Sequence, residues 1–458
     1  MTTSQFRKFL RLSFSVVTAL SMVSCASGGA NSGPSPAKFS LGSSSSSFRL
    51  PSFEEKTLPN GLRVLFIPDE TLPYVSYSLL IKSGSAQDPE NLTGLASMVA
   101  ELLDKGTSKR SAEQIAKDIG VLGADFDVSA TYDYTMVSAS SISPVSETLL
   151  KNVLEIVQNP AFSDQEIERV RKQTLAGIER RIDNPDGYAD LAFAEFLYGA
   201  HPYGQPTSGT AKTVAAIKKR NIVQFYLRAF QPGNSILAVV GKYTPELKAK
   251  IEQGFGGWEK REATESKFPE LTANEGRQYR LVDKPGLVQA QIRIGSYGIK
   301  RSDPDFVALR VANTILGGAF ESRLMNRIRK DLGLTYSINS GFDARREAGP
   351  FSVETFTKNA TTGQTVTETL KVLEDFRNSG VTSAELDRAK GYLTGIFPAA
   401  IETPEKLAYN LLVLRLYGIP DSYLTNYLGK VDDLSVSEVN RAIQKHLEPK
   451  NLKILVYS

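Results

Sequence analysis

The sequence is poor in the residues that form disulfides or bind transition metals. Its 458 residues include a single cysteine, Cys25, and two histidines, His201 and His446. One cysteine excludes an internal disulfide in any compartment. Two isolated histidines leave little from which to build a metal site based on imidazole nitrogens. A disulfide-stabilised scaffold is therefore excluded, and a histidine-based metal site is not expected.

The chain also lacks a strong excess of charge of one sign. It has 54 Lys and Arg against 50 Asp and Glu, a formal net charge of +4. Arg7, Lys8 and Arg11 supply +3 of that, so the rest of the chain is near +1. Because phosphate binding requires a concentrated basic surface, nucleic acid is not expected as a partner. The length and the 41% of hydrophobic residues are typical of a folded protein with two or more domains.

No apolar run near the N-terminus is long enough to cross a membrane as a helix. Arg7, Lys8 and Arg11 lead into the mostly apolar run Leu12 to Val23, which holds 12 residues. A spanning helix needs about 20 residues, whereas a basic start followed by a short apolar run is typical of a secretory signal. We therefore expect residues 1–24 to be a signal peptide and the mature chain to be exported.

Cys25 follows Met22-Val23-Ser24, where a bacterial lipobox would place it, and a Ser/Gly/Pro-rich stretch continues to about Ser47. A lipid on Cys25 would anchor the chain to a membrane, with residues 25–47 as a flexible tether. We expect a lipoprotein of the cell envelope. Ala26 after the cysteine favours the periplasmic side of the outer membrane in a Gram-negative cell. The alternative is an ordinary signal peptide with an incidental cysteine.

The chain contains an internal repeat at long period. Residues 163–169, SDQEIER, correspond to residues 382–388, TSAELDR, at an offset of 219, and both stretches are capping boxes that open a long helix. Two copies of one α+β domain are therefore predicted. Nearly the same offset relates Val153-Leu154-Glu155 to Val372-Leu373-Glu374, Asp88-Pro89 to Asp303-Pro304, and Gln231-Pro232-Gly233-Asn234 to Glu448-Pro449-Lys450-Asn451.

These repeats set the expected domain boundaries. We expect an N-terminal domain at residues 48–255, a polar linker at 256–276 and a C-terminal domain at 277–458. Each should be an α/β sandwich, with an antiparallel-rich sheet and helices packed on one face. Within the first copy, Val75 to Ile81 alternates as on a half-buried strand, and residues 125–140 are β-rich.

Residues 94–107 read GLASMVAELLDKGT and predict an amphipathic helix. Leu95, Met98, Val99 and Leu102 fall at i, i+3, i+4 and i+7, which places them on one apolar stripe facing a core. Ser97 and Glu101 lie one turn apart on another face of the same helix.

This helix resembles the zinc motif of the insulinase and pitrilysin family, whose members carry G-L-A-H-x-x-E-H-M-L-F-K-G-T. Aligned without gaps, the two histidine ligands fall on Ser97 and Glu101, and the catalytic glutamate falls on Ala100. The third ligand, a glutamate in the long helix after the first capping box, falls at Ala176 or Gly177. The resemblance implies two homologous domains that form a clam-like chamber.

The chemistry of that motif cannot be supplied by the residues that stand here. Two imidazoles and a carboxylate hold zinc, and a further glutamate takes the proton from the attacking water. Ser97, Ala100 and Gly177 provide none of these groups, and Glu179 lies on a different helix face from Gly177. We therefore expect no metal and no catalytic residue in this chain, and read Glu101 as a solvated carboxylate.

The two histidines do not restore the site. His201 lies in the loop sequence His-Pro-Tyr-Gly, a landmark of the family, where a structural role is expected. His446 lies near the end of the last helix, as a capping or surface residue.

The second half retains the other part of the family pattern. Residues 321–337, ESRLMNRIRKDLGLTYS, resemble the signature S-R-L-x-x-x-I/V-R-x-x-x-G-L-x-Y-S. In the family, the arginine and tyrosine seven positions apart, here Arg329 and Tyr336, face the zinc across the chamber and bind the substrate backbone. A guanidinium and a phenol are both donors, suited to a carbonyl oxygen that gains charge. The alternative is a helix-surface ion pair for Arg329 and a strand-core position for Tyr336.

The resemblance implies a division of labour, because some members pair a zinc-bearing chain with a metal-free one. We expect a non-catalytic, substrate-binding subunit of a cell-envelope zinc metalloprotease. Its partner would be a homologous chain that carries H-x-x-E-H and the zinc, and its substrates short or unfolded peptides. The alternatives are a peptide-binding or scaffold lipoprotein without a protease role, and a single-chain enzyme that uses a different metal or nucleophile.

Overall fold

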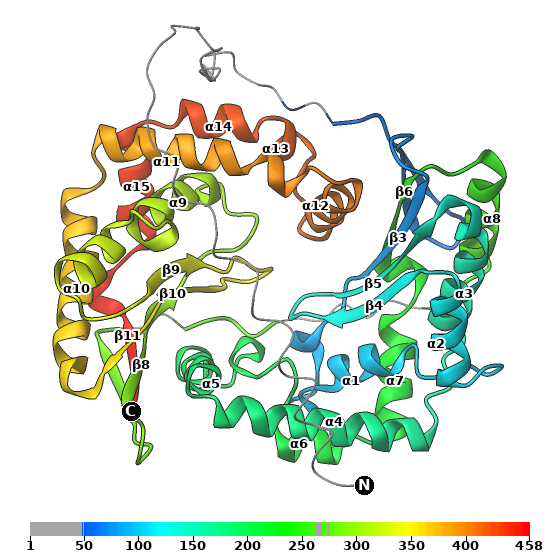
Figure 1. The fold of residues 1–458 in the computed structure, drawn as a ribbon, viewed down its shortest axis with the longest axis horizontal. Coiled ribbons are helices and arrows are strands. Elements are labelled where there is room, and N and C mark those ends of the chain that lie inside the picture. The colour runs from blue at the N-terminus through cyan, green and yellow to red at the C-terminus, as the bar shows by residue number, and fades with distance from the viewer. Residues whose placement is uncertain (1–47, 49, 262–267, 273–274) are drawn as a thin grey trace, which may run out of the picture. The chain divides into compact units, whose positions relative to one another are not determined.

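The computed structural model describes most of the chain after the Ser-rich stretch, and the described residues belong to one compact unit (Figure 1). The expected signal peptide, Cys25 and the tether at 25–47 lie outside the described residues. Within the described part, no helix is long and apolar enough to cross a membrane. The described residues are 48, 50–261, 268–272 and 275–458.

The first half of the chain forms a six-stranded sheet of order β1-β2-β6-β3-β5-β4. All neighbours are antiparallel except β2 and β6, which are parallel. Pro59-Asn60-Gly61 forms the turn between the first two strands. The strands are β1 (Glu54–Thr57), β2 (Arg63–Pro68), β3 (Tyr74–Ile81), β4 (Asp125–Ala130), β5 (Thr135–Ile142) and β6 (Ser235–Gly241).

The second half forms a five-stranded sheet of order β7-β11-β8-β10-β9, again with one parallel pair, β7 and β11. This order reproduces β2-β6-β3-β5-β4 of the first sheet strand for strand. The prediction of two copies of one mixed α/β fold is therefore confirmed. The strands are β7 (Gln278–Val282), β8 (Gln289–Tyr297), β9 (Ile338–Phe342), β10 (Pro350–Lys358) and β11 (Lys453–Tyr457).

The helices repeat in the same way, since α3, α4, α5 and α7 of the first half correspond to α10, α11, α12 and α15 of the second. In the first half they are α1 (Leu95–Leu102), α2 (Ala112–Val121), α3 (Ser146–Gln158), α4 (Asp164–Asp183), α5 (Pro185–Tyr198), α6 (Ala211–Ala216), α7 (Lys219–Ala229) and α8 (Pro245–Gly256). In the second they are α9 (Phe306–Asn313), α10 (Thr362–Ser379), α11 (Ser383–Ile396), α12 (Pro404–Leu416), α13 (Ser422–Thr425), α14 (Tyr427–Asp433) and α15 (Val436–His446).

The capping boxes predicted at the starts of α4 and α11 differ in detail. At α11 the box is complete, because Thr382 accepts from Glu385 N while the Glu385 side chain accepts from Thr382 N. At α4 only half of it forms. Ser163 accepts from Glu166 N, but the Glu166 carboxylate bonds to Arg169 Nε at 2.7 Å. The reciprocal bond predicted there is wrong, because a nearby guanidinium competes for the carboxylate.

Each sheet buries one face under the helices of its own half, which forms the two main cores. In the first core, Val75, Tyr77 and Leu79 of β3 are at most 1% exposed. The prediction that β3 is half-buried is wrong, because Ser76 and Ser78 on its opposite face are only 3% and 8% exposed. That opposite face is covered as well, by an element from the other half of the chain.

The two halves exchange one helix each. Helix α12 lies against β6 and β3 of the first sheet, and α5 lies against β8 and β11 of the second (Figure 1). Arg293 on β8, with its side chain only 2% exposed, bonds to Asp190 on α5 at 2.8 Å, and Arg415 on α12 bonds to Glu55 on β1 at 2.8 Å. Because α5 and α12 are equivalent in the repeat, the exchange is reciprocal and ties the halves together.

Asp133, in the β4–β5 loop, connects the two halves at a third place. The residue is 3% exposed, and its carboxylate accepts from Tyr203 Oη at 2.7 Å, Tyr417 Oη at 2.9 Å and Arg346 N at 2.8 Å. Tyr203 belongs to the first half, whereas Tyr417 and Arg346 belong to the second. One buried carboxylate therefore holds three segments that are distant in the sequence.

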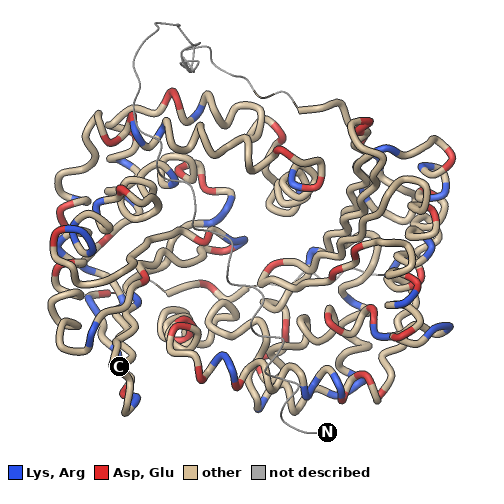
Figure 2. The backbone as a smooth tube through the Cα atoms, viewed as in Figure 1, with Lys and Arg blue, Asp and Glu red and all other residues tan. Residues whose placement is uncertain are grey.

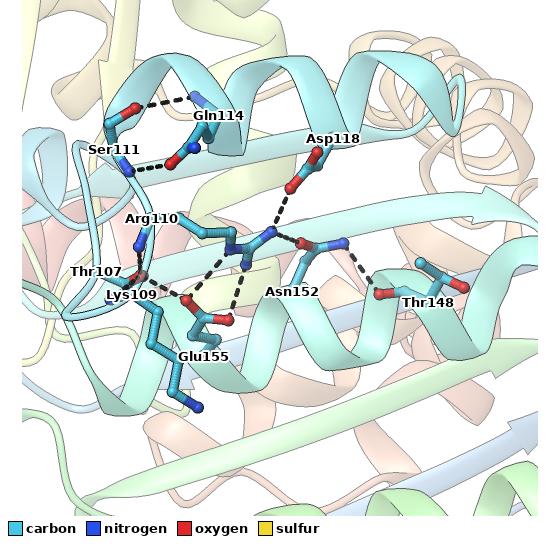
Figure 3. Close-up of polar contacts among 9 residues, drawn as sticks. All are labelled: Thr107, Lys109, Arg110, Ser111, Gln114, Asp118, Thr148, Asn152 and Glu155. Atoms are coloured by element: carbon cyan, nitrogen blue, oxygen red, sulfur yellow. Dashed lines mark hydrogen bonds and ion pairs between the residues drawn. The ribbon is translucent and has the colours of Figure 1, made fainter.

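A polar network fixes the connection between α1, α2 and α3 (Figure 3). The Arg110 guanidinium bonds to Asp118 at 2.7 Å, to Asn152 at 2.6 Å and to both carboxylate oxygens of Glu155 at 3.1 and 3.2 Å. Thr107, the last residue of the Lys-Gly-Thr landmark, donates to Glu155 as well. Four of the five N–H donors of Arg110 are used inside this network, which therefore stabilises the fold.

Replacing Arg110 by alanine should lower the free energy of unfolding by about 1–3 kcal/mol, because it removes charge-assisted hydrogen bonds and leaves Glu155 with Thr107 alone. Chemical denaturation monitored by circular dichroism measures the change. Arg169→Ala is the matched control. Its ion pair is more exposed, with the Arg169 side chain 42% accessible, and exposed pairs contribute roughly 0–1 kcal/mol. An equal loss in both variants would contradict this account of the network.

Candidate functional site

The helix that carries the altered zinc motif forms as predicted. Helix α1 spans Leu95–Leu102, and its apolar stripe is 0–3% exposed. Gly94 precedes it with φ of 93°, a conformation that favours glycine. The Asp88 carboxylate accepts from Gly94 N and Ala96 N, both at 2.9 Å, and so satisfies the start of the helix. The packing landmarks of the motif are therefore intact.

The metal-binding face of α1 carries no set of ligands. The Ser97 hydroxyl donates to Thr207 O at 2.7 Å and is used in fixing that loop. Ala100, at the position of the catalytic glutamate, is 2% exposed and has no polar side chain. Of Ser97, Ala100 and Glu101, which occupy the three motif positions on α1, only Glu101 has a carboxylate.

Helix α4 lies beside α1, where the third ligand is expected. Although Glu101 is exposed at the surface of α1, partial burial of its carboxyl raises its pKa, while Lys105 and a hydrogen bond with Thr174 of α4 oppose the shift. Gly177, three residues beyond Thr174, provides no side chain, and Glu179 is exposed. A serine, an alanine, a glycine and one carboxylate do not fit a zinc ion, which requires about four nitrogen, sulfur or oxygen ligands.

His201 has the structural role predicted for it. It is 5% exposed, its Nδ1 accepts from Tyr203 N at 3.1 Å, and its ring lies among those of Tyr198, Tyr203 and Phe268. Burial lowers the pKa of His201, which favours the neutral ring.

His446 is half-buried and contacts Asp305 through Nε2 at 3.0 Å, so it is neither a helix cap nor a free surface residue. With Asp303 and Asp305 it forms the one group of three residues able to bind a metal within the described part of the chain. Asp305, however, also forms ion pairs with Lys445 at 2.8 Å and with Arg441 at 3.1 Å. Two cations on this carboxylate disfavour a metal ion there.

Arg329 and Tyr336 lie together at the surface, on either side of the glycine turn at Gly333. The Arg329 guanidinium carbon is 4.8 Å from the centre of the Tyr336 ring and 5.0 Å from that of Phe320. Tyr336 is 75% exposed and Phe320 72%, and Arg329 makes no ion pair with any described residue. Neither a surface ion pair nor a strand-core position, the two alternative roles, fits these residues.

The rest of the 321–337 signature holds this pair in place. Residues 325–331 form a π-helical turn, a distortion that is frequent at functional sites. Met325, Ile328 and Leu334 are at most 9% exposed and anchor the segment in the second core. Arg323 bonds to both oxygens of Glu385 on α11 at 2.7 Å. The signature therefore contains buried anchors, two ion pairs (Arg323 with Glu385 and Arg327 with Glu368) and a donor pair at the surface.

The ion pair between Arg323 and Glu385 should make stability depend on pH. Burial acts to raise the pKa of Glu385, but the Arg323 guanidinium and the Thr382 hydrogen bonds outweigh it and lower that pKa to about 2. Because the folded-state pKa lies below the unfolded value of about 4.3, the contribution is present above that value and is lost as pH falls toward 2.

We expect Glu385→Gln to lower the free energy of unfolding by about 1–3 kcal/mol at pH 7 and by progressively less below pH about 4.5. Denaturation of both proteins at a series of pH values measures this. A difference that does not shrink on acidification would contradict the role of the ionised carboxyl.

Two features of the site carry no clear signal in the sequence. Phe320 follows Gly317-Gly318 and resembles any apolar residue near a helix end, yet it stacks against Arg329 in the folded chain. Strand β4 forms an edge of the first sheet, with no further strand beside it among the described residues, and it lies close to α1. A free edge can hydrogen-bond an extended peptide.

The chain matches two parts of one peptidase family. Residues 63–211 match the insulinase family, peptidase family M16, and residues 216–393 match the peptidase M16 inactive domain. The chain is 29% identical over 399 residues to an uncharacterized zinc protease of Mycobacterium bovis, covering 85% of this chain and 90% of that protein. It is 25% identical over 402 residues to the non-peptidase homolog YmxG of Helicobacter pylori, covering 86% and 91%.

Solved structures show the same fold. A crystal structure of a peptidase M16 inactive domain from Pseudomonas fluorescens matches with a TM-score of 0.83 and 29% identity, over 88% of this chain and 98% of that one. A protease from Helicobacter pylori matches with a TM-score of 0.81 and 22% identity, over 89% and 100%. Together with the repeated sheets and the altered motif on α1, these similarities show that the chain belongs to the insulinase family, peptidase family M16.

Proposed function

We propose that this chain is the non-catalytic, substrate-binding subunit of a zinc metalloprotease in the cell envelope. Its partner would be a homologous chain that carries H-x-x-E-H and binds the zinc. The observation that carries the proposal is an asymmetry between the halves. The first half keeps the packing of the zinc helix without its ligands, whereas the second half presents a donor pair at the surface, the partly exposed Arg329 and the exposed Tyr336.

The geometry of the donor pair suits a substrate that comes from outside the chain. Arg329 has no carboxylate partner among the described residues, and the Tyr336 hydroxyl makes no hydrogen bond to them. Stacking on two exposed rings orients the guanidinium while leaving its N–H groups free, so it can donate to a peptide carbonyl. A structural arginine, such as Arg323, instead donates its hydrogen bonds to groups within the fold, here Glu385 and Gly380 O.

Relatives of this chain include proteins named as zinc proteases and one named as a non-peptidase homolog. A family that contains both kinds is compatible with a pair of one zinc-bearing and one metal-free chain. Export and a lipid on Cys25 are part of the proposal, and they rest on the N-terminal sequence alone.

The proposal is tested by purifying the chain from its own cells and identifying co-purifying proteins by mass spectrometry. We expect a homologous chain with H-x-x-E-H in about equal amount. Each chain alone should leave an unfolded peptide intact, and the two together should hydrolyse it. Recovery of other envelope proteins without a zinc-bearing homologue would overturn the proposal in favour of a scaffold role.

A further inference from the structure

The two sheets differ at one outer edge, although their other strands match. In the first sheet, β1 pairs antiparallel with β2 and covers the outer side of that strand. The equivalent strand of the second sheet is β7, and no strand of the described residues pairs with its outer side. The repeat therefore leaves an edge open in the second half whose counterpart is covered in the first.

Equivalent positions on β2 and β7 differ sharply in exposure. Because β2 pairs in parallel with β6 as β7 does with β11, Val64 corresponds to Tyr279 and Phe66 to Leu281. Val64 and Phe66 are 0% and 2% exposed, whereas Tyr279 and Leu281 are 64% and 72% exposed. The same two positions of the fold thus belong to the core in one half and to the surface in the other.

Two elements of the first half cause this difference. Helix α8 contributes Leu247, Ile251 and Phe255 to the first core, and its Lys248 ammonium lies 4.9 Å from the centre of the Phe66 ring. Strand β1 covers the neighbouring edge. The described part of the second half contains no counterpart of α8 or β1. Apolar side chains on an open strand edge are a surface to which another strand can pair.

The backbone of β7 is available for such pairing. The N–H of Gln278 and the C=O of Val282 are bonded to residues that flank β11. Since successive residues of a strand direct their backbone groups to opposite sides, Tyr279 and Leu281 direct theirs to the open edge. Their N–H and C=O groups can therefore extend the sheet by one more strand.

We propose that β7 pairs antiparallel with β7 of a second copy of this chain, about a two-fold axis at Arg280. A two-fold axis necessarily makes the two strands antiparallel, which is also the orientation in which β1 covers β2. In this register Tyr279 lies opposite Leu281 of the second copy, and Leu281 opposite its Tyr279. Two aromatic–aliphatic pairs then cover the side chains that each copy alone leaves exposed.

The charges at the ends of β7 favour this register. Arg277 precedes the strand and Asp283 follows it, so each Arg277 lies opposite Asp283 of the second copy. Asp283 is exposed and makes no ion pair with the described residues, while Arg277 also bonds to Glu374. A shift of the pairing by two residues in either direction would place Asp283 opposite Glu275 or Tyr279 instead. The charges are therefore complementary in one register only.

Arg280 lies on the axis and meets its own copy, but its charge is balanced within each chain. Its guanidinium carbon is 4.5 Å from the centre of the Phe196 ring on α5, and its Nη1 is 3.8 Å from the Glu195 carboxylate. Elsewhere, acidic and basic residues are interspersed along the chain (Figure 2). No large surface of one sign therefore opposes the association of two copies.

Sedimentation velocity of the purified full chain tests the proposal. We expect a reversible dimer with a dissociation constant of about 10 μM. Leu281→Lys should raise that constant about tenfold or more, because lysine at a strand edge opposes pairing. Leu72→Lys is the matched control, since Leu72 is 67% exposed and lies in the first half, and it should leave the constant unchanged. Circular dichroism verifies that both variants fold.

A cross-linking experiment tests the register. In a chain with Cys25→Ser, Arg280→Cys should give a disulfide-linked dimer under mild oxidation with copper phenanthroline, because residue 280 faces its own copy. Gln278→Cys should not, since the two copies of residue 278 would lie about 13 Å apart, too far for a disulfide. Equal cross-linking of both variants, or none with Arg280→Cys, would overturn the proposed pairing.

The inference does not depend on the proposed function. Strand β7 lies at the opposite edge of the second sheet from β9, the strand that follows Tyr336. A wild-type chain that stays monomeric at about 200 μM, or a dimer that Leu281→Lys leaves as tight as before, would overturn it. A monomeric chain whose Leu281→Lys variant no longer retains a zinc-bearing homologue would also overturn it, because the edge would then bind that homologue.

Discussion

Replacing Arg329 by alanine should lower peptide turnover by the two-chain complex by about 10²- to 10³-fold, the usual cost of removing one donor to a carbonyl oxygen that gains charge. The guanidinium is held between the rings of Phe320 and Tyr336 and has no carboxylate partner among the described residues. The effect should appear mainly in kcat, because the donor contributes most when charge develops on the oxygen. Steady-state hydrolysis of a fluorogenic peptide measures it.

Lys330→Ala is the matched control for this variant. Lys330 is the next residue and is exposed, and its side chain makes no hydrogen bond or ion pair with the described part of the chain. Its removal should leave turnover within about twofold of the wild type. Tyr336→Phe should fall between the two, because it loses the phenolic donor and keeps the ring beside Arg329. Wild-type turnover by the Arg329→Ala complex would show that the pair does not act on the substrate.

Asp133→Ala should lower the free energy of unfolding by about 3–5 kcal/mol, because it removes three hydrogen bonds to a buried carboxylate and leaves their donors unpaired. Tyr203, Tyr417 and the backbone of Arg346 all donate to this one side chain, and they come from both halves of the chain. Chemical denaturation followed by circular dichroism gives the value. The loss should exceed that of any single exposed ion pair in the protein.

Two further variants check the role of Asp133. Tyr417→Phe removes one donor from the second half and should cost about 1–2 kcal/mol. Asp183→Ala, at an exposed position at the end of α4, should cost less than about 0.5 kcal/mol. If Asp133→Ala were as stable as Asp183→Ala, the carboxylate would not connect the halves as described.

Much of the fold could be predicted because its signals are local. The apolar spacing of Leu95, Met98, Val99 and Leu102 alone identified α1, and the capping residues Ser163 and Thr382 identified the starts of α4 and α11. The repeat then extended these signals across the chain, since equivalent segments lie at nearly constant offsets. The altered metal positions were also predictable, because Ser97, Ala100 and Gly177 follow from an alignment without gaps.

Features that depend on contacts between distant segments could not be predicted. The reciprocal exchange of α5 and α12 has no local signal, because each helix has apolar residues that would suit either sheet. The alternation along β3 predicts a solvent face for Ser76 and Ser78, because it cannot show that a helix from the other half covers them. The stacking of Phe320 on Arg329 likewise arises only when the chain folds.

The contrast between the two halves supports the proposed subunit role over simple decay of the motif. If α1 no longer had a function, the residues that stabilise its start and its apolar face could also have changed. Asp88 still accepts a hydrogen bond at the start of the helix, and Gly94 and the buried apolar residues of α1 are still present. The same chain presents Arg329 and Tyr336 without internal partners. A subunit that completes the site of another chain needs both an intact fold and an exposed donor pair.

The zinc content of the purified chain and of its complex tests this account most directly. Elemental analysis by mass spectrometry should find about one zinc per pair of chains in the complex, and none above background in this chain purified alone. Ser97→Ala with Glu101→Ala in this chain should leave the zinc content of the complex unchanged. One tightly bound zinc per copy of this chain alone, lost in that double variant, would contradict the account.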